Sequence, residues 1–293
     1  SVHFIDQNTG WAVGTNGTLI KTTNGGLQWT NQQINTDYHL LSIFFINQNT
    51  GWITGNEGII LKTTDGGNEW NITNLDLPNS IYSIHFIDEN NGWAAGPFLI
   101  LRTIDGGNTW TPKVGLDIGF VTSIYFTDIN NGWAVGDAGR VIKTTNGGID
   151  WNLKSSGVTS NLKSVYFTDA NNGWAVGLFG TIITTVNGGE TWSEQTSGNT
   201  STLYSVKFFD ANTGFVAGGK ILKTTNGGTN WDEQTYPVSR VLNLNSISLS
   251  GQNNVWAVGD YGTILNTTNS GTTWLLQSSG ITFDLRAIHF TST

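Results

Sequence analysis

Residues 132–151 read GWAVGDAGRVIKTTNGGIDW, and this stretch decides the fold because close copies of it recur along the whole chain. The Gly-Trp pair, or a close variant, returns about every forty-one residues, and Phe215 replaces the tryptophan in the sixth copy. A second marker, Thr-Thr-Asn-Gly-Gly-x-x-Trp or a near match, follows each copy in step. Self-similarity with a period of about 40–45 residues is typical of propellers and solenoids.

Each copy contains four short runs of β-branched and aromatic residues, which we label strands A to D. In the third copy these runs are residues 83–87, 93–95, 99–103 and 109–111, separated by polar turns rich in Asn and Gly. Four strands joined by hairpins and repeated radially make a propeller blade, whereas a solenoid needs no such chain reversals. We therefore predict an all-β, seven-bladed propeller of four-stranded blades, with the tryptophans of both markers largely buried between blades. The predicted single domain spans 1–293, with repeats at 1–41, 42–82, 83–122, 123–163, 164–204, 205–245 and 246–286.

An eighth copy of strand A follows the seventh repeat at residues 287–293 and resembles the first strand near Ser1. Seven blades have only seven first strands, so one apolar strand is surplus, and an unpaired strand edge promotes aggregation. It could take the place of residues 1–4, pair with a second copy of the chain, or lead into another module of a longer protein. We favour a contact outside its own blades, through self-association or a longer parent chain.

Composition narrows the choice of partners. The chain has 13 Lys and Arg against 21 Asp and Glu, a net charge of −8, which argues against nucleic acid or an anionic membrane surface. No apolar run is long enough to insert into a bilayer. Without cysteine or methionine, the chain suits an oxidising exterior, so we expect a secreted or cell-surface protein whose signal peptide lies outside residues 1–293. The four histidines lack the spacing of a metal site, and we expect no metal and no cofactor.

The second marker resembles the Asp box of bacterial neuraminidase repeats, with residues 63–70 the nearest match. The Asn or Asp side chain of such a turn bonds back to the backbone, so we assign it a structural role rather than a sugar or metal site. The whole chain, through motifs such as residues 132–151, resembles the photosystem II assembly and stability factor family of propellers. This resemblance implies the propeller fold and points to its secreted bacterial branch, of the kind found in Bacteroidota. The seven turn residues are Asn24, Asp65, Asp105, Asn146, Asn187, Asn226 and Asn269.

The repeats also predict which face binds. The A–B and C–D turns are nearly identical in every copy, whereas the B–C hairpins and D–A connections differ, so we place specific binding on the latter, the variable face. Side chains at its hairpin tips could form a contact patch or fold inward over their own blades, and those beside the strand A serine could bind a ligand at a channel mouth or only solvate the pore. The predicted binding residues are Phe98, Phe179, Tyr261, Asp137 and Asp260 at hairpins, and Tyr82, Tyr204, Lys163 and Arg286 at the channel mouth.

Three classes of function remain open from the sequence. The first is a non-catalytic binding or scaffold module for a protein or a surface glycan. The second is a glycoside hydrolase or sialidase, which needs paired carboxylates, or a tyrosine with an arginine clamp, across one cleft. The third is a structural subunit of an extracellular assembly that uses the surplus strand. The dispersed carboxylates and the few arginines of the chain favour the first class.

Overall fold

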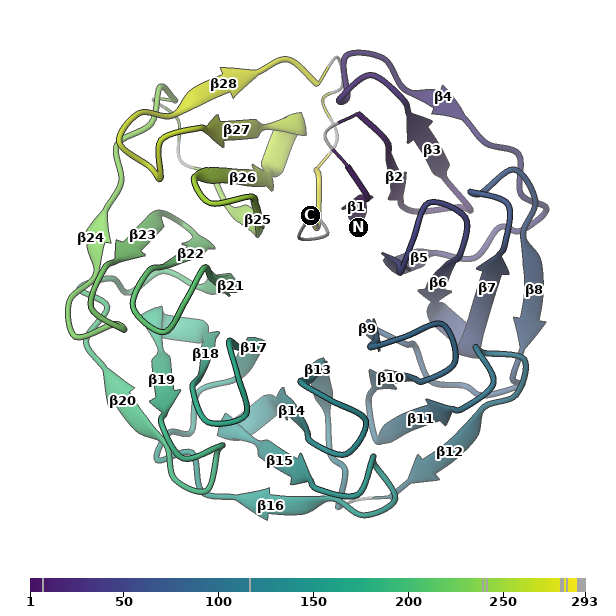
Figure 1. Cartoon of the computed structure of the whole chain (residues 1–293), viewed down its shortest axis with the longest axis horizontal. Coiled ribbons are helices and arrows are strands. Elements are labelled where there is room, and N and C mark those ends of the chain that lie inside the picture. Colours follow the sequence, from purple (N-terminus) through teal and green to yellow (C-terminus); the bar gives the residue numbers. More distant parts are fainter. Residues whose placement is uncertain are drawn as a thin grey trace. The chain divides into compact units, whose positions relative to one another are not determined.

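The computed structural model describes residues 1–6, 8–115, 117–238, 240, 242–279, 282 and 284–288. These residues form seven four-stranded antiparallel sheets, the blades of a seven-bladed β-propeller, so the predicted fold is confirmed (Figure 1). Helix is limited to four three-residue 3-10 turns, η1 (Asn56–Gly58), η2 (Asp137–Gly139), η3 (Leu178–Gly180) and η4 (Asp260–Gly262), within the described residues.

Each blade uses consecutive strands in the order A, B, C, D. The first three blades are β1 (Val2–Phe4), β2 (Gly10–Val13), β3 (Leu19–Thr22), β4 (Thr30–Asn31); β5 (Leu40–Phe45), β6 (Gly51–Gly55), β7 (Ile59–Thr63), β8 (Asn71–Asn74); and β9 (Ser83–Phe86), β10 (Gly92–Gly96), β11 (Leu99–Thr103), β12 (Thr111–Val114). Blades four and five are β13 (Val121–Phe126), β14 (Gly132–Gly136), β15 (Val141–Thr144), β16 (Asn152–Lys154); and β17 (Leu162–Phe167), β18 (Gly173–Gly177), β19 (Ile182–Thr185), β20 (Ser193–Gln195). Blades six and seven are β21 (Leu203–Phe208), β22 (Gly214–Gly218), β23 (Ile221–Thr224), β24 (Asp232–Glu233); and β25 (Leu244–Ser250), β26 (Asn254–Gly259), β27 (Ile264–Thr267), β28 (Leu275–Gln277).

The chain divides into two compact units. The first comprises residues 1–132 and 144–151, and the second comprises residues 133–143 and 152–293. Each unit has its own apolar clusters. One in the first unit surrounds the buried Trp11 and Phe45, and one in the second unit surrounds Phe215 and Trp274.

The Gly-Trp marker is explained by packing between neighbouring blades. The Trp52 ring of blade two stacks on Phe86 of blade three, with ring centroids 3.5 Å apart. Phe86 in turn lies against Gly92, where an added Cβ would come within 2.4 Å of the phenyl ring. Glycine before the tryptophan of β10 therefore leaves room for the ring that joins the two blades.

Two sequence expectations need correction. The tryptophans of both markers were expected to be largely buried. In the first marker Trp256 is only half-buried, whereas the others are buried. In the second marker only Trp192 and Trp274 are buried and the other five are half-buried, because this marker stands just before the outermost strand D, where less of the blade covers the ring than on strand B. Strand A was expected to begin at its serine, whereas in blade two it begins at Leu40, with a bulge between Leu40 and Ser42. Blades five to seven carry the same bulge.

The surplus segment is described only up to Ile288, so most of the predicted strand at 287–293 lies outside the described residues. Ile288 is buried, and its carbonyl accepts a hydrogen bond from the Ser246 hydroxyl at 3.2 Å. The Ser205 hydroxyl meets the Ile247 carbonyl in the same way at 3.5 Å. Ile288 therefore lies against blade seven as strand A of blade seven lies against blade six.

Candidate binding site

The backbone assigns the connections to two faces, as the repeats predicted. On one face the amide of the C–D turn donates to the A–B turn, as Gly106 does to Asn90 at 2.8 Å. On the other, the B–C hairpin bonds to the following D–A connection, as Phe98 does to the Gly119 carbonyl at 2.7 Å. We call the first the uniform face and the second the variable face.

Six of the seven B–C hairpins, those of blades one to five and of blade seven, share an uncommon backbone conformation. In these six the tip residue is left-handed, with φ between 53° and 58°, although it is not glycine. Asn16 of blade one is a residue type that tolerates this conformation, but the bulky Phe98, Phe179 and Tyr261 hold it too. Their side chains are exposed by 43%, 74% and 55%, so they do not fold inward over their blades.

The D–A connections hold these hairpins rigidly. After the tip of blade five comes Gly180, with φ of 71°, and a Cβ there would lie 1.7 Å from the Asn199 carbonyl oxygen. The Leu178 amide donates to the Asn161 carbonyl at 2.9 Å. The Phe179 ring is therefore presented from a backbone that is fixed on both sides.

In the first unit the variable face is hollowed beside blade two. A pocket of about 750 Å3 is lined by residues 34–38 of a D–A connection and by Asn56 and Glu57 of a hairpin. His39, the next residue along the chain, fixes this connection between two hairpins, because its amide donates to the Asn56 side-chain oxygen at 2.8 Å and its Nδ1 accepts from the Asn16 amide at 3.2 Å. The lining is mostly polar, which suits hydrogen bonding to a peptide backbone or a sugar.

In the second unit the Tyr261 ring lies under Arg240, whose guanidinium carbon is 4.6 Å from the ring centroid. The carboxylate of the neighbouring Asp260 is engaged by the scaffold, since it accepts from the amide and side chain of Asn243 at 3.0 and 2.9 Å. Tyr261 and Arg240 thus offer an aromatic and a cationic surface, while Asp260 holds the connection that supports them.

Side chains two positions after the strand A serine form rows of rings. In the first unit His3, Phe44, His85 and Tyr125 follow one another with centroids 4.8–5.7 Å apart. In the second, the Lys207 ammonium lies 4.8 Å from the centre of the Tyr166 ring, and burial lowers the pKa of Lys207 to about 8. The sequence gives no sign of this change in the pKa of Lys207, because the change depends on how deeply the fold buries the ammonium group.

The predicted channel-mouth residues make separate contacts. Tyr82 packs on Phe120 with centroids 5.9 Å apart, and Arg286 pairs with Asp284 at 3.5 Å. Lys163, Tyr204 and, at its hairpin, Asp137 are partly exposed. Within the described residues, no hydrogen bond or ring contact joins two of the nine predicted binding residues, whose combined role stays a prediction.

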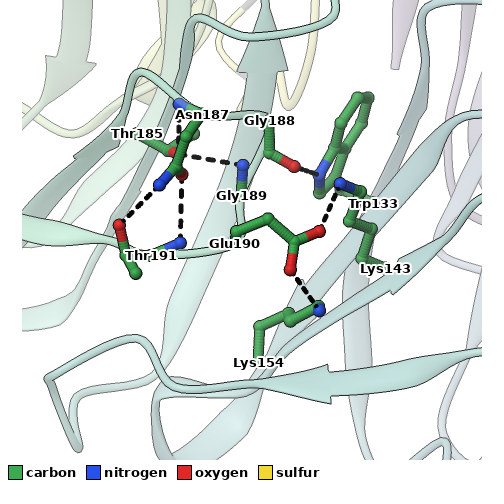
Figure 2. Close-up of polar contacts among 9 residues, drawn as sticks. All are labelled: Trp133, Lys143, Lys154, Thr185, Asn187, Gly188, Gly189, Glu190 and Thr191. Atoms are coloured by element: carbon green, nitrogen blue, oxygen red, sulfur yellow. Dashed lines mark hydrogen bonds and ion pairs between the residues drawn. The ribbon is translucent and has the colours of Figure 1, made fainter.

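On the uniform face the predicted turn residues bond to their own turns. In blade five the Asn187 side-chain oxygen accepts from the Thr185 hydroxyl and the Thr191 amide at 2.9 and 3.0 Å, and equivalent bonds recur in all seven blades (Figure 2). The turn also anchors the preceding blade, because the Trp133 indole donates to the Gly188 carbonyl at 2.9 Å. The sequence did not reveal this bond between blades, which needs two positions about 55 residues apart to be known as neighbours.

Figure 2 also shows an ionic contact between blades, in which Glu190 lies between two lysines of blade four. Its two carboxylate oxygens accept from Lys143 at 2.7 Å and Lys154 at 2.6 Å. These hydrogen bonds hold the pKa of the Glu190 carboxyl at about 2, below its usual 4.5.

Among the described residues, no three His, Cys, Asp or Glu side chains lie close enough together to hold a metal ion. None of the helices in that part of the chain has the length and apolar character needed to cross a membrane.

Comparison with known proteins identifies relatives of this propeller. A family model described as photosynthesis system II assembly factor YCF48 matches residues 1–78, 68–153 and 196–279. A solved structure, "YCF48 bound to D1 peptide", is similar with a TM-score of 0.76 and 24% identity over 92% of each chain. YCF48 from Cyanidioschyzon merolae gives a TM-score of 0.74 and 21% identity, covering 92% of this chain and 95% of that one. A GH74 xyloglucanase from Xanthomonas campestris gives 0.64 and 12%, covering 98% of this chain and 62% of the enzyme. Curated protein sequences give no match.

Proposed function

The chain belongs to the family of the photosynthesis system II assembly factor YCF48, and we propose that it is a non-catalytic scaffold that binds a segment of a partner protein on its variable face. The observation that carries this proposal is the set of exposed aromatic rings at left-handed hairpin tips, Phe98, Phe179 and Tyr261. A left-handed conformation costs a residue other than glycine about 1–2 kcal/mol. Since these rings are exposed, little burial offsets that cost, and contact with a partner would give them a function.

The surroundings of the tips suit a polypeptide. The polar pocket beside Asn56 offers partners for a peptide backbone, and Tyr261 with Arg240 offers stacking and charge. YCF48, which has this fold, has been solved with a D1 peptide bound. We propose a polypeptide ligand for this chain by analogy with that complex.

A glycoside hydrolase is the weaker candidate. The reaction needs two carboxylates flanking one sugar bond. Of the predicted acids on the variable face, Asp260 is committed to Asn243, as described above. The similarity to the xyloglucanase concerns the fold alone.

We propose that the protein acts outside the cytoplasm, in keeping with a chain that has 0 cysteines and 0 methionines. A surface glycan is then the second ligand to test. The polar lining of the pocket beside Asn56 and Glu57 is the feature that would suit it.

A peptide selection with variant controls tests the proposal. Peptides selected from a random library on the immobilised protein are titrated against Phe179→Ser, Tyr261→Ser and Val186→Ser. Val186 is the matched control because it is 75% exposed but lies in the C–D turn of blade five, on the uniform face. We expect the two aromatic variants to bind about tenfold or more weakly, with unchanged melting temperature, and the Val186 variant to bind normally.

Two results would count against this function. One is selected peptides that bind the aromatic variants as tightly as the parent protein. The other is a glycan array that yields a specific sugar while no peptide is selected.

A further inference from the structure

The Glu190 contact serves as an internal template for a second site. In the groove between blades four and five, Lys143 of strand C and Lys154 of strand D each donate to one oxygen of Glu190 (Figure 2). Glu190 is the residue after the two turn glycines of blade five. A carboxylate that accepts two charge-assisted hydrogen bonds is held strongly.

The groove between blades three and four also has a cationic side chain at each of the two equivalent positions. Arg102 is the counterpart of Lys143, and Lys113 is the counterpart of Lys154. The positions agree in space as well: the Arg102 guanidinium nitrogen is 3.2 Å from a Cβ built on Gly147, and the Lys143 ammonium is 3.5 Å from one built on the equivalent Gly188.

This groove has no acidic residue at the position equivalent to Glu190. At the position of Glu190, blade four has Ile149, which is 58% exposed. The nearby turn carbonyl, that of Gly147, already accepts from the Trp93 indole at 2.8 Å. Within the described part of the chain, the Arg102 Nε is buried without a hydrogen-bond partner.

The positive charge of Lys113 is only weakly paired with an acid. Its one ion pair in the described chain is with Asp150, at 3.9 Å, and Asp150 is 67% exposed. That carboxylate also accepts from the Asn146 side chain at 3.1 Å. An exposed pair at this distance contributes little, so Lys113 can serve a second acid.

The groove is hollow where the carboxylate would lie. Arg102 and Lys113 line a pocket of about 230 Å3 together with Ile104, Pro112 and Ile149. Ile104 is 65% exposed, so an apolar surface borders the two charges. Two cations beside an apolar surface suit a peptide in which an acidic residue stands next to an aliphatic one.

We propose that this pocket binds the side-chain carboxylate of a partner polypeptide, with Arg102 and Lys113 in the roles that Lys143 and Lys154 have toward Glu190. The site lies in a groove of the first unit, apart from the hairpin tips on which the proposed function rests.

The test uses the intact protein and two amide-capped peptides, acetyl-Ala-Ile-Glu-Ile-Ala-amide and its Gln counterpart. The chain has only four arginines, so the Nε–Hε signal of Arg102 can be assigned in a nitrogen-15 spectrum with Arg102→Gln. We expect the Glu peptide to shift that signal and to bind about tenfold more tightly than the Gln peptide, because bonds to a charged acceptor are the stronger ones. Arg102→Gln and Lys113→Gln should each weaken the Glu peptide to the level of the Gln peptide.

Ile149→Glu supplies the decisive variant, with Ile149→Gln as its matched control. The new carboxylate should occupy the pocket as Glu190 occupies its own, so that the Glu peptide no longer shifts the Arg102 signal, while the Gln variant still binds. Equal binding of the two peptides by the parent protein, or undiminished binding by Ile149→Glu, would overturn the proposal. Phe179→Ser should leave this binding unchanged, which separates this site from the variable face.

Discussion

Replacing Trp52 by Phe should destabilise the protein more than replacing Trp11 by Phe. The two indoles are closely matched, since both are fully buried and stack on a phenylalanine, at 3.5 Å for Trp52 and 3.7 Å for Trp11. Each also donates to a turn carbonyl of the next blade, at 2.9 Å and 3.2 Å. The loss of apolar contact should therefore be similar in the two variants.

The two variants should differ in stability because only one of the two turn carbonyls keeps a hydrogen-bond donor after the tryptophan is replaced. The Gly66 carbonyl that Trp11 reaches also accepts from Lys21 at 2.8 Å, so it keeps a partner in the variant. The Gly106 carbonyl that Trp52 reaches loses its donor, because Lys62 is bound to the Asn108 side chain at 3.0 Å. A buried group left without a partner costs about 1–3 kcal/mol. At about 2–4 °C per kcal/mol, Trp52→Phe should melt about 2–12 °C below Trp11→Phe.

Thermal unfolding followed by circular dichroism measures this difference. Blade six supplies a natural comparison, because Phe215 stands at the tryptophan position and Lys223 donates to the turn carbonyl of Ser270 at 2.6 Å. Phe215→Trp should therefore relieve no unpaired acceptor, because the Ser270 carbonyl already has a donor. Equal melting temperatures for Trp11→Phe and Trp52→Phe would refute the assigned role of the indole bond.

Three further predictions concern other parts of the fold. Gly198→Ala should lower the free energy of unfolding by roughly 1 kcal/mol, because Gly198 has a left-handed backbone conformation. Gly180→Ala should lower it by well over that amount, because Gly180 is also left-handed and its Cβ would lie 1.7 Å from a carbonyl oxygen. Chemical denaturation of the two variants measures the difference. The Glu190 carboxyl, with its pKa lowered from 4.5 to about 2, contributes stability that is present above its unfolded pKa and lost as the pH falls through the folded one. The melting-temperature difference between the parent protein and Glu190→Gln should therefore be constant above about pH 5 and vanish near about pH 2. Deleting residues 287–293 removes the buried Ile288 and should therefore lower the melting temperature. Light scattering on the same samples tests whether this segment mediates self-association. A smaller mass after deletion supports self-association, and an unchanged monomer mass rules it out.

Much of the architecture could be predicted from the repeats. The period and the Asn-Gly turns predict the blades because strands and hairpins depend on local residue types. The two faces follow from comparing copies, since identical turns mark one face and differing hairpins the other. The half-buried state of Trp110 could not be obtained this way, because it depends on how much of the ring the rest of the fold covers.

The groove residues show a different limit. Arg102 and Ile149 are 47 positions apart, and nothing local shows that strand C of one blade faces the C–D turn of the next. Once the structure shows that Lys143 meets Glu190, however, the same pairing can be read between each repeat and the one that follows it in the sequence. The residues of the groove can therefore be read from the sequence, but only after one observed contact has shown which positions of neighbouring blades face each other.

Both proposed sites lie where one copy of the repeat departs from a more stable solution found in another copy. Asn16 suits the left-handed tip, yet Phe179 holds the same conformation with its ring exposed. Glu190 neutralises two cations between blades, yet Ile149 leaves Arg102 and Lys113 without that acid. Each departure costs folding free energy, through backbone strain in the first case and an unpaired buried donor in the second. Because the chain contains the more stable alternative in each case, stability does not explain these residues, whereas the partner contacts proposed above would explain them.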